Sequence, residues 1–243
     1  MARVTEAHLE ARRKQIVEAA WQSFARQGYH QTTMQDIADA AGLSAGAIYR
    51  YFPGKDALLK AINDRSQEMG RALLAVARSR AQGPVDVLQV LGETLFSVFY
   101  DPLFEATTRA NVEIWPEMLR SELLRAALRQ ELTFWREAVA ELLREAQRRG
   151  DLKPEVDPEA AVILFMAAWE GLRQWRMIDP ENFTPERVLQ AMQPVFGGVM
   201  TVQLDPSGQA ARAGPHLEPP FGTRMPGPRQ GEKQGQDERD EGL

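Results

Sequence analysis

The chain has 243 residues, of which 26% are charged and 44% hydrophobic, and its formal net charge is -5. It contains no cysteine and only three histidines, which excludes a disulfide framework and a thiolate metal site. An acid-base or metal-dependent enzyme would be poorly supplied with side chains, so we expect no enzymatic activity, no metal and no cofactor. The charged N-terminus and the lack of any uncharged stretch long enough to span a membrane indicate a cytoplasmic protein.

The segment 33–55 predicts two short helices around a glycine turn. Thr33 and Asp36 form a capping pair, because a hydroxyl before a helix and an acid three residues later satisfy backbone amides that have no partner inside the helix. Apolar residues then recur at helical spacing until Gly42, which supplies the backbone freedom to end the helix. The segment therefore begins with one helix that stops at the turn.

A second helix is predicted over residues 45–52, with Ser44 as its cap. One of its sides is apolar, whereas the other begins with small residues and continues with Tyr49 and Arg50. Small residues let a helix enter a major groove while hydroxyls and cations contact the flanking phosphates. A helical hairpin inside a core is the common explanation of such a turn, but it needs no aromatic and basic cluster up to Lys55. The segment therefore favours DNA binding.

Residues 10–70 resemble the DNA-binding domain of the TetR family of transcriptional regulators. The positions that match the family's pattern are Arg13, Ile16, Ala19, Ala20, Phe24, Gly28, Tyr29, Thr33, Ile37, Ala38, Ala41, Gly42, Leu43, Ser44, Ile48, Tyr49, Tyr51, Phe52 and Lys55. Their number and order make the match specific over this part of the chain. Beyond residue 70 the resemblance is one of architecture.

The resemblance implies that Thr33, Tyr49 and Lys55 contact phosphates, with Tyr51 as a further candidate. It places five positions near base edges, namely Gln35, Ser44, Ala45, Gly46 and Ala47. Only two of these five residues can hydrogen-bond through a side chain, so we expect few direct hydrogen bonds to base edges. Arg50 is a candidate for an additional base or phosphate contact, and DNA shape is expected to contribute discrimination.

Charge is unevenly distributed along the chain. Residues 1–60 hold eight Lys/Arg and six Asp/Glu, an excess of two positive charges, so the remainder carries -7. A mildly basic head on an acidic body favours approach to DNA by one face only and predicts salt-sensitive binding.

The body of the chain predicts one helix after another. The expected helices cover residues 56–81, 84–100, 102–115, 121–149, 159–177 and 184 to about 202. With the N-terminal helices the total is about nine, and the fold class is all-α. We expect a helix-turn-helix DNA-binding domain over 1–55, a helical ligand-binding and dimerisation domain over 56–204, and a disordered tail rich in Pro, Gly and charge over 205–243.

The segment 160–169 is apolar around the whole helix, so both of its sides need to be covered. Burial within one chain is one explanation. Together with the last helix, however, the segment resembles the two helices that a TetR protomer contributes to a dimeric four-helix bundle. The expected interface residues are Ala161, Ala168, Val188, Met192, Val195, Phe196 and Val199. We expect a homodimer, because one recognition helix alone contacts too little DNA.

Aromatic side chains are concentrated in the middle helices, where TetR-like bodies hold a ligand cavity. The candidate ligand-binding residues are Phe99, Thr108, Asn111, Trp115, Phe134, Phe165, Met166 and Trp169. Such a lining suits an apolar guest, although aromatic residues at helical spacing also simply fill a core. Nearby polar groups, among them Glu170 and Arg173, could orient a polar head group, whereas Arg109 and Glu113 have the spacing of a surface ion pair.

The resemblance implies a repressor that releases a double-stranded DNA operator when a small, mainly hydrophobic molecule enters the body and swings the 56–81 connector. A fatty acyl-CoA is the leading candidate for this molecule. The alternative is a TetR-fold ligand-binding or scaffold protein without specific DNA binding. Replacing Lys55 by Ala is expected to separate the two, since only a DNA-binding protein would lose affinity.

Overall fold

The computed structural model describes the backbone of residues 6–197 and the side chains of residues 6–192. Within these ranges the chain forms nine α-helices and no β-strand, which confirms the predicted all-α class. The helices are α1 (Glu6–Gln27), α2 (Met34–Ala40), α3 (Ala45–Tyr49), α4 (Lys55–Arg80), α5 (Pro84–Ser97), α6 (Phe104–Arg120), α7 (Glu122–Arg149), α8 (Pro158–Ile178) and α9 (Pro185–Gly197), and a 3-10 turn, η1 (Val98–Tyr100), follows α5. The expected disordered tail lies outside the described residues.

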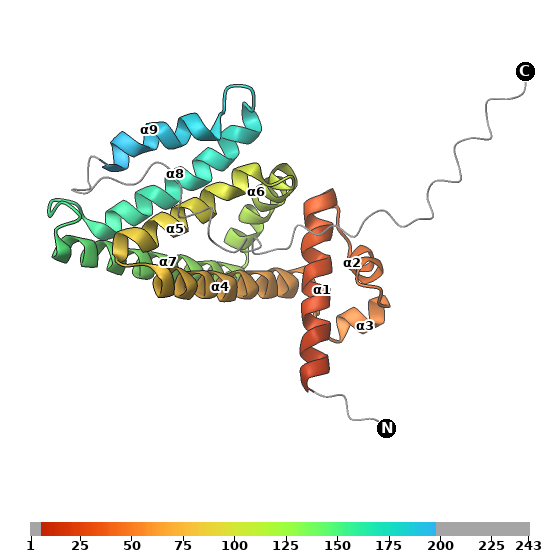
Figure 1. Ribbon diagram of the computed structural model, residues 1–243. Helices are drawn as coiled ribbons and strands as arrows, with labels where there is room; N and C mark the ends of the chain where they lie inside the picture. Colours follow the sequence, from red (N-terminus) through yellow and green to blue (C-terminus); the bar gives the residue numbers. More distant parts are fainter. Residues whose placement is uncertain (1–5, 198–243) are drawn as a thin grey trace, which may run out of the picture.

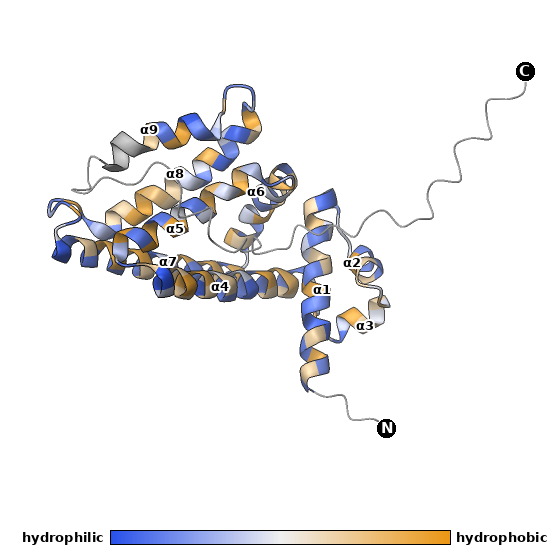
Figure 2. Ribbon diagram, viewed as in Figure 1, coloured by the Kyte–Doolittle hydropathy of each residue, from blue (hydrophilic) through white to orange (hydrophobic). Residues whose placement is uncertain are grey.

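The helices form a small head and an elongated body (Figure 1). In the head, α1 lies across the end of α4, and α2 and α3 pack beside it. In the body, α4, α5 and α7 pack against one another, α6 joins them from the side of the head, and α8 covers α7. Hydrophobic and hydrophilic positions alternate along these helices (Figure 2), as amphipathic helices require. No helix in the described part of the chain is long and apolar enough to cross a bilayer.

The local sequence accounts for most helix ends. Thr33 caps α2 with the full capping box, in which the Thr33 hydroxyl accepts from the Asp36 N–H and the Asp36 carboxylate accepts from the Thr33 N–H. Ser44 caps α3 and Ser121 caps α7 through their side-chain oxygens. Gly150 ends α7 with a φ of 82°, in the left-handed region that favours glycine.

Two predicted helices have different ends in the structure. The predicted helix 45–52 stops at Tyr49, because Pro53 disfavours the helical conformation at Phe52, which instead turns into the core and is 1% exposed. The predicted segment 102–115 becomes α6, which begins at residue 104 and continues through Pro116 to residue 120. Pro116 leaves only the carbonyl four residues earlier without its helical donor, at the exposed Val112. Water can satisfy that carbonyl, so the helix persists.

Three clusters of buried side chains hold the fold together. The first joins α1, α2 and α3 to the start of α4 and also includes Ala110, Ile114 and Met118 of α6 and Leu124 of α7. The second lies between α4, α5 and α7, and the third joins α5, η1, α6, α8 and the segment before α9. The first cluster crosses the predicted boundary at residues 55/56, so head and body share one core rather than meeting through a linker.

Candidate DNA-binding face and effector region

The α3 helix presents the predicted DNA-contact residues to solvent. Tyr49 is 54% exposed, and Arg50 and Gly46 are also exposed. A Cβ atom on Gly46 would meet no atom within 4 Å. Ser44 at the start of α3, and Thr33 and Gln35 at the start of α2, are exposed as well, whereas Ala45, Ala47 and Tyr51 are half-buried. The predicted residues of α2 and α3 are therefore exposed or half-buried on two helices that pack against each other.

Several polar groups among these residues already have partners within the chain. The Thr33 hydroxyl donates to the Asp36 carboxylate at 2.7 Å, and hydrogen bonds from Thr33, first from its backbone, lower the pKa of Asp36. The Gln35 amide donates to Asp39 at 2.8 Å, and the Ser44 oxygen accepts from the Ala47 N–H at 3.2 Å. These bonds hold the side chains in place, so a base or phosphate contact by Thr33 or Gln35 would exchange one partner for another.

Lys55 lies at the start of α4 with its ammonium turned toward the loop between α1 and α2. The Nζ donates to the carbonyl oxygens of Tyr29 and Thr32 at 2.7 and 3.1 Å and lies 4.3 Å from the centroid of the Tyr29 ring. Desolvation lowers the pKa of Lys55, while Glu117 and Glu113 oppose that shift. Replacing Lys55 by Ala would therefore disturb this loop as well as any phosphate contact. A loss of affinity in that variant would not distinguish a DNA-binding regulator from a scaffold protein of the TetR fold.

The long helix α1 holds α2 and α3 in position. Arg13 stacks its guanidinium 4.6 Å from the centroid of the Phe52 ring and donates to the Tyr51 carbonyl at 3.4 Å. Gln15 donates to the carbonyl of Ala41, at the end of α2, at 2.7 Å. These contacts close both α2 and α3 against α1, which gives the exposed face a fixed orientation.

A hydrogen bond joins the head to α6. The Glu113 carboxylate accepts from the backbone N–H of Tyr29 at 2.7 Å, and the neighbouring Glu117 lies 3.9 Å from the His30 imidazole. Gly28 makes the approach of Glu113 possible, because a Cβ there would lie 2.7 Å from both carboxylate oxygens. The predicted surface pair of Arg109 with Glu113 is absent from the ion pairs of the described residues. Glycine before an aromatic residue was the only sequence signal for this junction.

We expect Gly28→Ala to destabilise the protein by about 2 to 4 kcal/mol, because it strains a backbone with φ 86° and displaces a charged hydrogen-bond acceptor. Gly150→Ala is the matched control, since its φ of 82° imposes similar strain while a Cβ there meets nothing within 4 Å. Urea unfolding of both variants measures the difference, which isolates the contact with Glu113. Equal losses would show that the junction contributes nothing to stability.

The predicted ligand-binding residues divide between two clusters. Phe99 is completely buried and packs against Phe96, Phe104, Trp169 and Phe183, with ring centroids 5.2 to 5.7 Å apart. Thus Phe99 and Trp169 meet, but as part of a closed aromatic cluster.

The other predicted ligand-binding residues lie at different depths. Phe134 belongs to the second cluster and lies beneath the guanidinium of Arg71. Trp115 is 37% exposed, because it follows the buried Ile114 by one residue and therefore points about 100° away around α6. Asn111, Phe165 and Met166 are half-buried. The structure does not bring Trp115 into the interior.

A buried polar cluster lies between α4, α6, α7 and α8, beside these aromatic residues. Thr108 accepts from the Arg173 guanidinium at 3.4 Å, and Arg173 also lies 3.7 Å from Glu170. Glu131 of α7 accepts from the Ser66 hydroxyl at 3.5 Å. Burial raises the pKa of Glu131 to about 7, with a further contribution from the Glu170 charge. The sequence held a signal for it, since Glu131 continues the buried stripe of α7 four residues after Ala127.

We expect Glu131→Gln to stabilise the protein above pH 7. A carboxyl whose folded pKa is raised contributes most stability below its unfolded pKa of 4.5 and loses it as pH rises through about 7. The wild-type protein should thus lose roughly 2 to 3 kcal/mol between pH 4.5 and 8 at this group, whereas the amide loses nothing. Thermal unfolding at pH 5 and pH 8 tests this. If the stability of the variant depended on pH as the stability of the wild type does, the Glu131 carboxyl would not have a raised pKa.

The predicted dimer residues that the structure describes lie on α8 and α9. Ala161, Ala168, Val188 and Met192 are half-buried, the side chains of Val195 and Phe196 lie outside the described residues, and so does Val199. Ala168 and Met192 line a shallow groove between the two helices with Gly171, Leu172 and Trp175. Large apolar side chains of α8 remain uncovered in the single chain, namely Ile163, Leu164, Trp175 and Ile178, with exposures of 57 to 79%. The α8 helix therefore has the exposed apolar surface that the sequence predicted.

A helix-turn-helix head with an exposed second helix, fixed to a helical body, defines a DNA-binding transcriptional regulator. Comparison with known proteins supports this class. Residues 16–62 match the family model of bacterial regulatory proteins of the tetR family, and residues 118–192 match the tetracyclin repressor-like C-terminal domain. The chain is 32% identical to the HTH-type transcriptional regulator TtgR of Pseudomonas putida over 183 residues, which is 73% of this chain and 86% of TtgR. The chain belongs to the TetR family.

Two further comparisons cover 80% and 26% of the chain. The solved structure of Salmonella enterica GusR superposes with a TM-score of 0.60 at 27% identity, over 80% of this chain and 98% of GusR. A transcriptional repressor of Mycobacterium tuberculosis is 45% identical over 62 residues, which is 26% of this chain and 33% of that protein. Because the matched relatives are transcriptional regulators, the chain is a regulator rather than an enzyme.

Proposed function

We propose that the protein is a homodimeric repressor whose operator affinity is controlled by a small molecule. The proposal treats residues 1–55 as the DNA-binding domain and residues 56–204 as the effector and dimerisation domain. The observation that carries it is the open face of α3, where Gly46, Tyr49 and Arg50 are exposed on a helix held by a closed core. The 62-residue match to a protein described as a repressor favours negative regulation.

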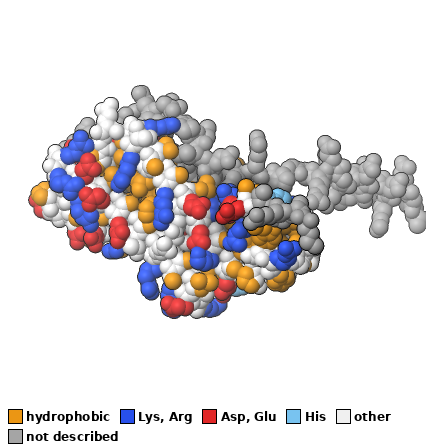
Figure 3. Space-filling model, turned by 90° about the horizontal axis from the view of Figure 1, so that it is seen from below, with side chains coloured by type: hydrophobic (Ala, Val, Ile, Leu, Met, Phe, Trp, Pro, Cys, Tyr) orange, Lys and Arg blue, Asp and Glu red, His pale blue; other side chains and the backbone are white. Residues whose placement is uncertain are grey.

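The proposed DNA contacts follow from this face. Tyr49 and Arg50 are the leading phosphate contacts because they are exposed and make no ion pair within the described residues. Ser44, Ala45, Gly46 and Ala47 would approach the base edges. Figure 3 shows Lys/Arg and Asp/Glu side chains interspersed over the face seen there. Affinity should then depend on a few phosphate contacts and fall with salt.

Fluorescence anisotropy with the DNA upstream of the protein's own gene tests the proposal. A salt titration in the presence of random competitor DNA should show tight, competitor-resistant binding that weakens as the salt concentration rises. Binding no tighter than to random DNA, unchanged after removal of any co-purified ligand, would favour a scaffold protein of the TetR fold instead.

Dimerisation is proposed through α8 and α9. The exposed apolar side chains of α8 continue beside the groove that Met192 of α9 lines, and a second copy of this surface would cover both. Gly171→Arg places a charge in this groove, where a Cβ meets nothing within 4 Å, so each protomer should still fold. Light scattering at micromolar concentration should give a dimer for the wild type and for Gln130→Arg, an exposed control on α7, and a monomer for Gly171→Arg. A monomeric wild type would remove this part of the proposal.

The effector is proposed to enter among the middle helices and to be mainly hydrophobic. The closed contacts of Phe99 and Trp169 mean that a guest must move rings apart, and the buried Thr108 and Arg173 could then hydrogen-bond its polar end. Fatty acyl-CoAs are the first class to screen. Thermal-shift assays in which acyl-CoAs are inert and another chemical class stabilises the protein would replace this candidate.

A further inference from the structure

A pocket of about 330 Å³ lies where α1 of the head faces α6 of the body, away from the middle helices. Its lining is Trp21, Gln22, Ala25 and Arg26 from α1, and Pro102, Leu103, Glu105, Ala106, Thr107 and Arg109 from α6 and the residues before it. This volume is at the lower end of the range of small-molecule sites. The pocket therefore suits a compact ligand.

The pocket combines an apolar floor with a charged end. Trp21 is 8% exposed, and together with Ala25, Leu103 and Ala106 it offers an aromatic and aliphatic surface. Arg26 and Arg109 make no ion pair within 4 Å in the described part of the chain. A guanidinium with no ion pair among the described residues, that of Arg109, at the end of a pocket floored by an indole favours a flat aromatic ligand that carries one negative charge.

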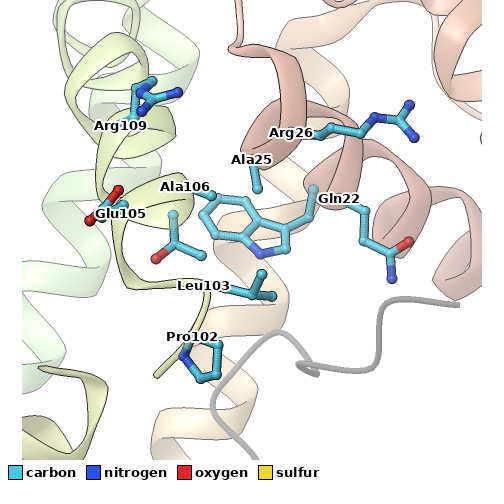
Figure 4. A pocket seen from close by; sticks show the side chains of 10 residues that line it. Gln22, Ala25, Arg26, Pro102, Leu103, Glu105, Ala106 and Arg109 are labelled. Carbon is cyan, nitrogen blue, oxygen red and sulfur yellow. The ribbon is translucent and has the colours of Figure 1, made fainter. Parts of the chain in front are cut away.

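Figure 4 shows how the labelled residues lie around the pocket. Arg26 and Arg109 are at one end of it, and Pro102 is at the other. The Arg109 side chain extends to the α1 side of α6, whereas the Glu105 carboxylate lies on the side turned away from α1. Arg26 extends away from α6, so Arg109 is the cation nearer to a ligand in the pocket.

We propose that this pocket is a second small-molecule site, which binds a compact aromatic carboxylate with its ring against Trp21 and its carboxylate on Arg109. One wall of the site belongs to the DNA-binding head and the other to the body. Arg109 also lies one helical turn before Glu113, which bonds the Tyr29 N–H of the head. A ligand that draws α6 and α1 together therefore acts on the same junction that orients α2 and α3.

Isothermal titration calorimetry of the full-length protein with 2-naphthoate tests the proposal, with the uncharged 2-naphthamide as the matched probe. We expect 2-naphthoate to bind roughly tenfold more tightly than the amide, because only the carboxylate gains a charge-assisted hydrogen bond. Arg109→Gln should weaken 2-naphthoate by roughly tenfold and leave the amide unchanged, whereas Arg109→Lys should retain part of the preference. Arg129→Gln, at an exposed position on α7, should change neither.

A second set of variants tests the proposal by filling the pocket. Ala106→Phe places a ring in the cavity and should abolish binding of both probes, and Ala25→Leu does the same from the opposite wall should the first variant not fold. Circular dichroism and thermal unfolding verify each fold. Undetectable binding of 2-naphthoate, or binding that survives both Arg109→Gln and the filling variants, would overturn the proposal. None of these measurements uses DNA. If the proposed repressor function failed, the binding of 2-naphthoate would therefore still test the pocket.

Discussion

Gly46→Glu should lower operator affinity by about 100-fold or more, because a carboxylate at the exposed start of α3 would face the phosphates and base edges, where like-charge juxtaposition costs several kcal/mol. The fold should be unaffected or slightly stabilised, since a Cβ at Gly46 meets no atom within 4 Å and glutamate is a better helix former than glycine. Fluorescence anisotropy against the upstream DNA measures the loss, and urea unfolding verifies the stability.

Two control variants distinguish the effect of a negative charge on α3 from two other effects. One is the larger side chain, and the other is the change in the overall charge of the protein. Gly46→Gln has nearly the same shape without the charge, so it should retain more affinity than the glutamate variant. Gln130→Glu adds the same charge on the exposed surface of α7, far along the chain from α3, and should leave affinity within about twofold, as expected for a distant, screened charge. If Gly46→Glu still bound the operator like the wild type, α3 would not be the recognition helix.

Phe99→Ala should destabilise the protein by about 3 to 5 kcal/mol, the cost of truncating a fully buried ring that the surrounding structure cannot refill. Phe99 is 0% exposed and touches four other rings, which come from α5, α6, α8 and the segment before α9. Losing this ring removes the centre of the third hydrophobic cluster. Urea unfolding at fixed protein concentration gives the difference, since a dimer's stability depends on concentration.

Phe99→Leu is the matched control and should cost only roughly 1 to 1.5 kcal/mol, because most of the volume is retained. The comparison also bears on the effector. A loss below about 1 kcal/mol for Phe99→Ala would mean that the ring lines a space already open to a ligand rather than a packed core. The closed contacts in the structure predict the large loss.

The sequence predicted the helices and the exposure of Tyr49 and Arg50 well, because the causes of both are local. The capping box at Thr33 and the cap at Ser44 each act within a few residues of the chain, and both are confirmed. The left-handed Gly150 that ends α7 acts over an equally short range. The exposure of Tyr49 and Arg50 also follows from helical periodicity beside a buried Ile48. Their contacts with DNA stay a prediction.

Other predictions depended on where a side chain points around its helix, or on whether a helix continues past a proline. Trp115 was expected in the interior, but the register of α6 buries Ile114 and Met118 instead. The predicted segment ended at residue 115, yet α6 continues through Pro116 because only one exposed carbonyl is left without its donor. The type of residue favours burial or a helix end, whereas the packing of the whole helix decides where each side chain points.

The sequence alone was enough to predict that the chain folds into helices, where most of them begin, and which short helix exposes its polar side, since caps, turns and hydrophobic periodicity act over one or two helical turns. Only the tertiary structure decided that Glu113 bonds the Tyr29 N–H, that Lys55 is held by loop carbonyls, and that α1 and α6 enclose a pocket. The residues in the Glu113 bond are 84 positions apart. No local preference can specify such a contact, because it exists only after the helices have packed.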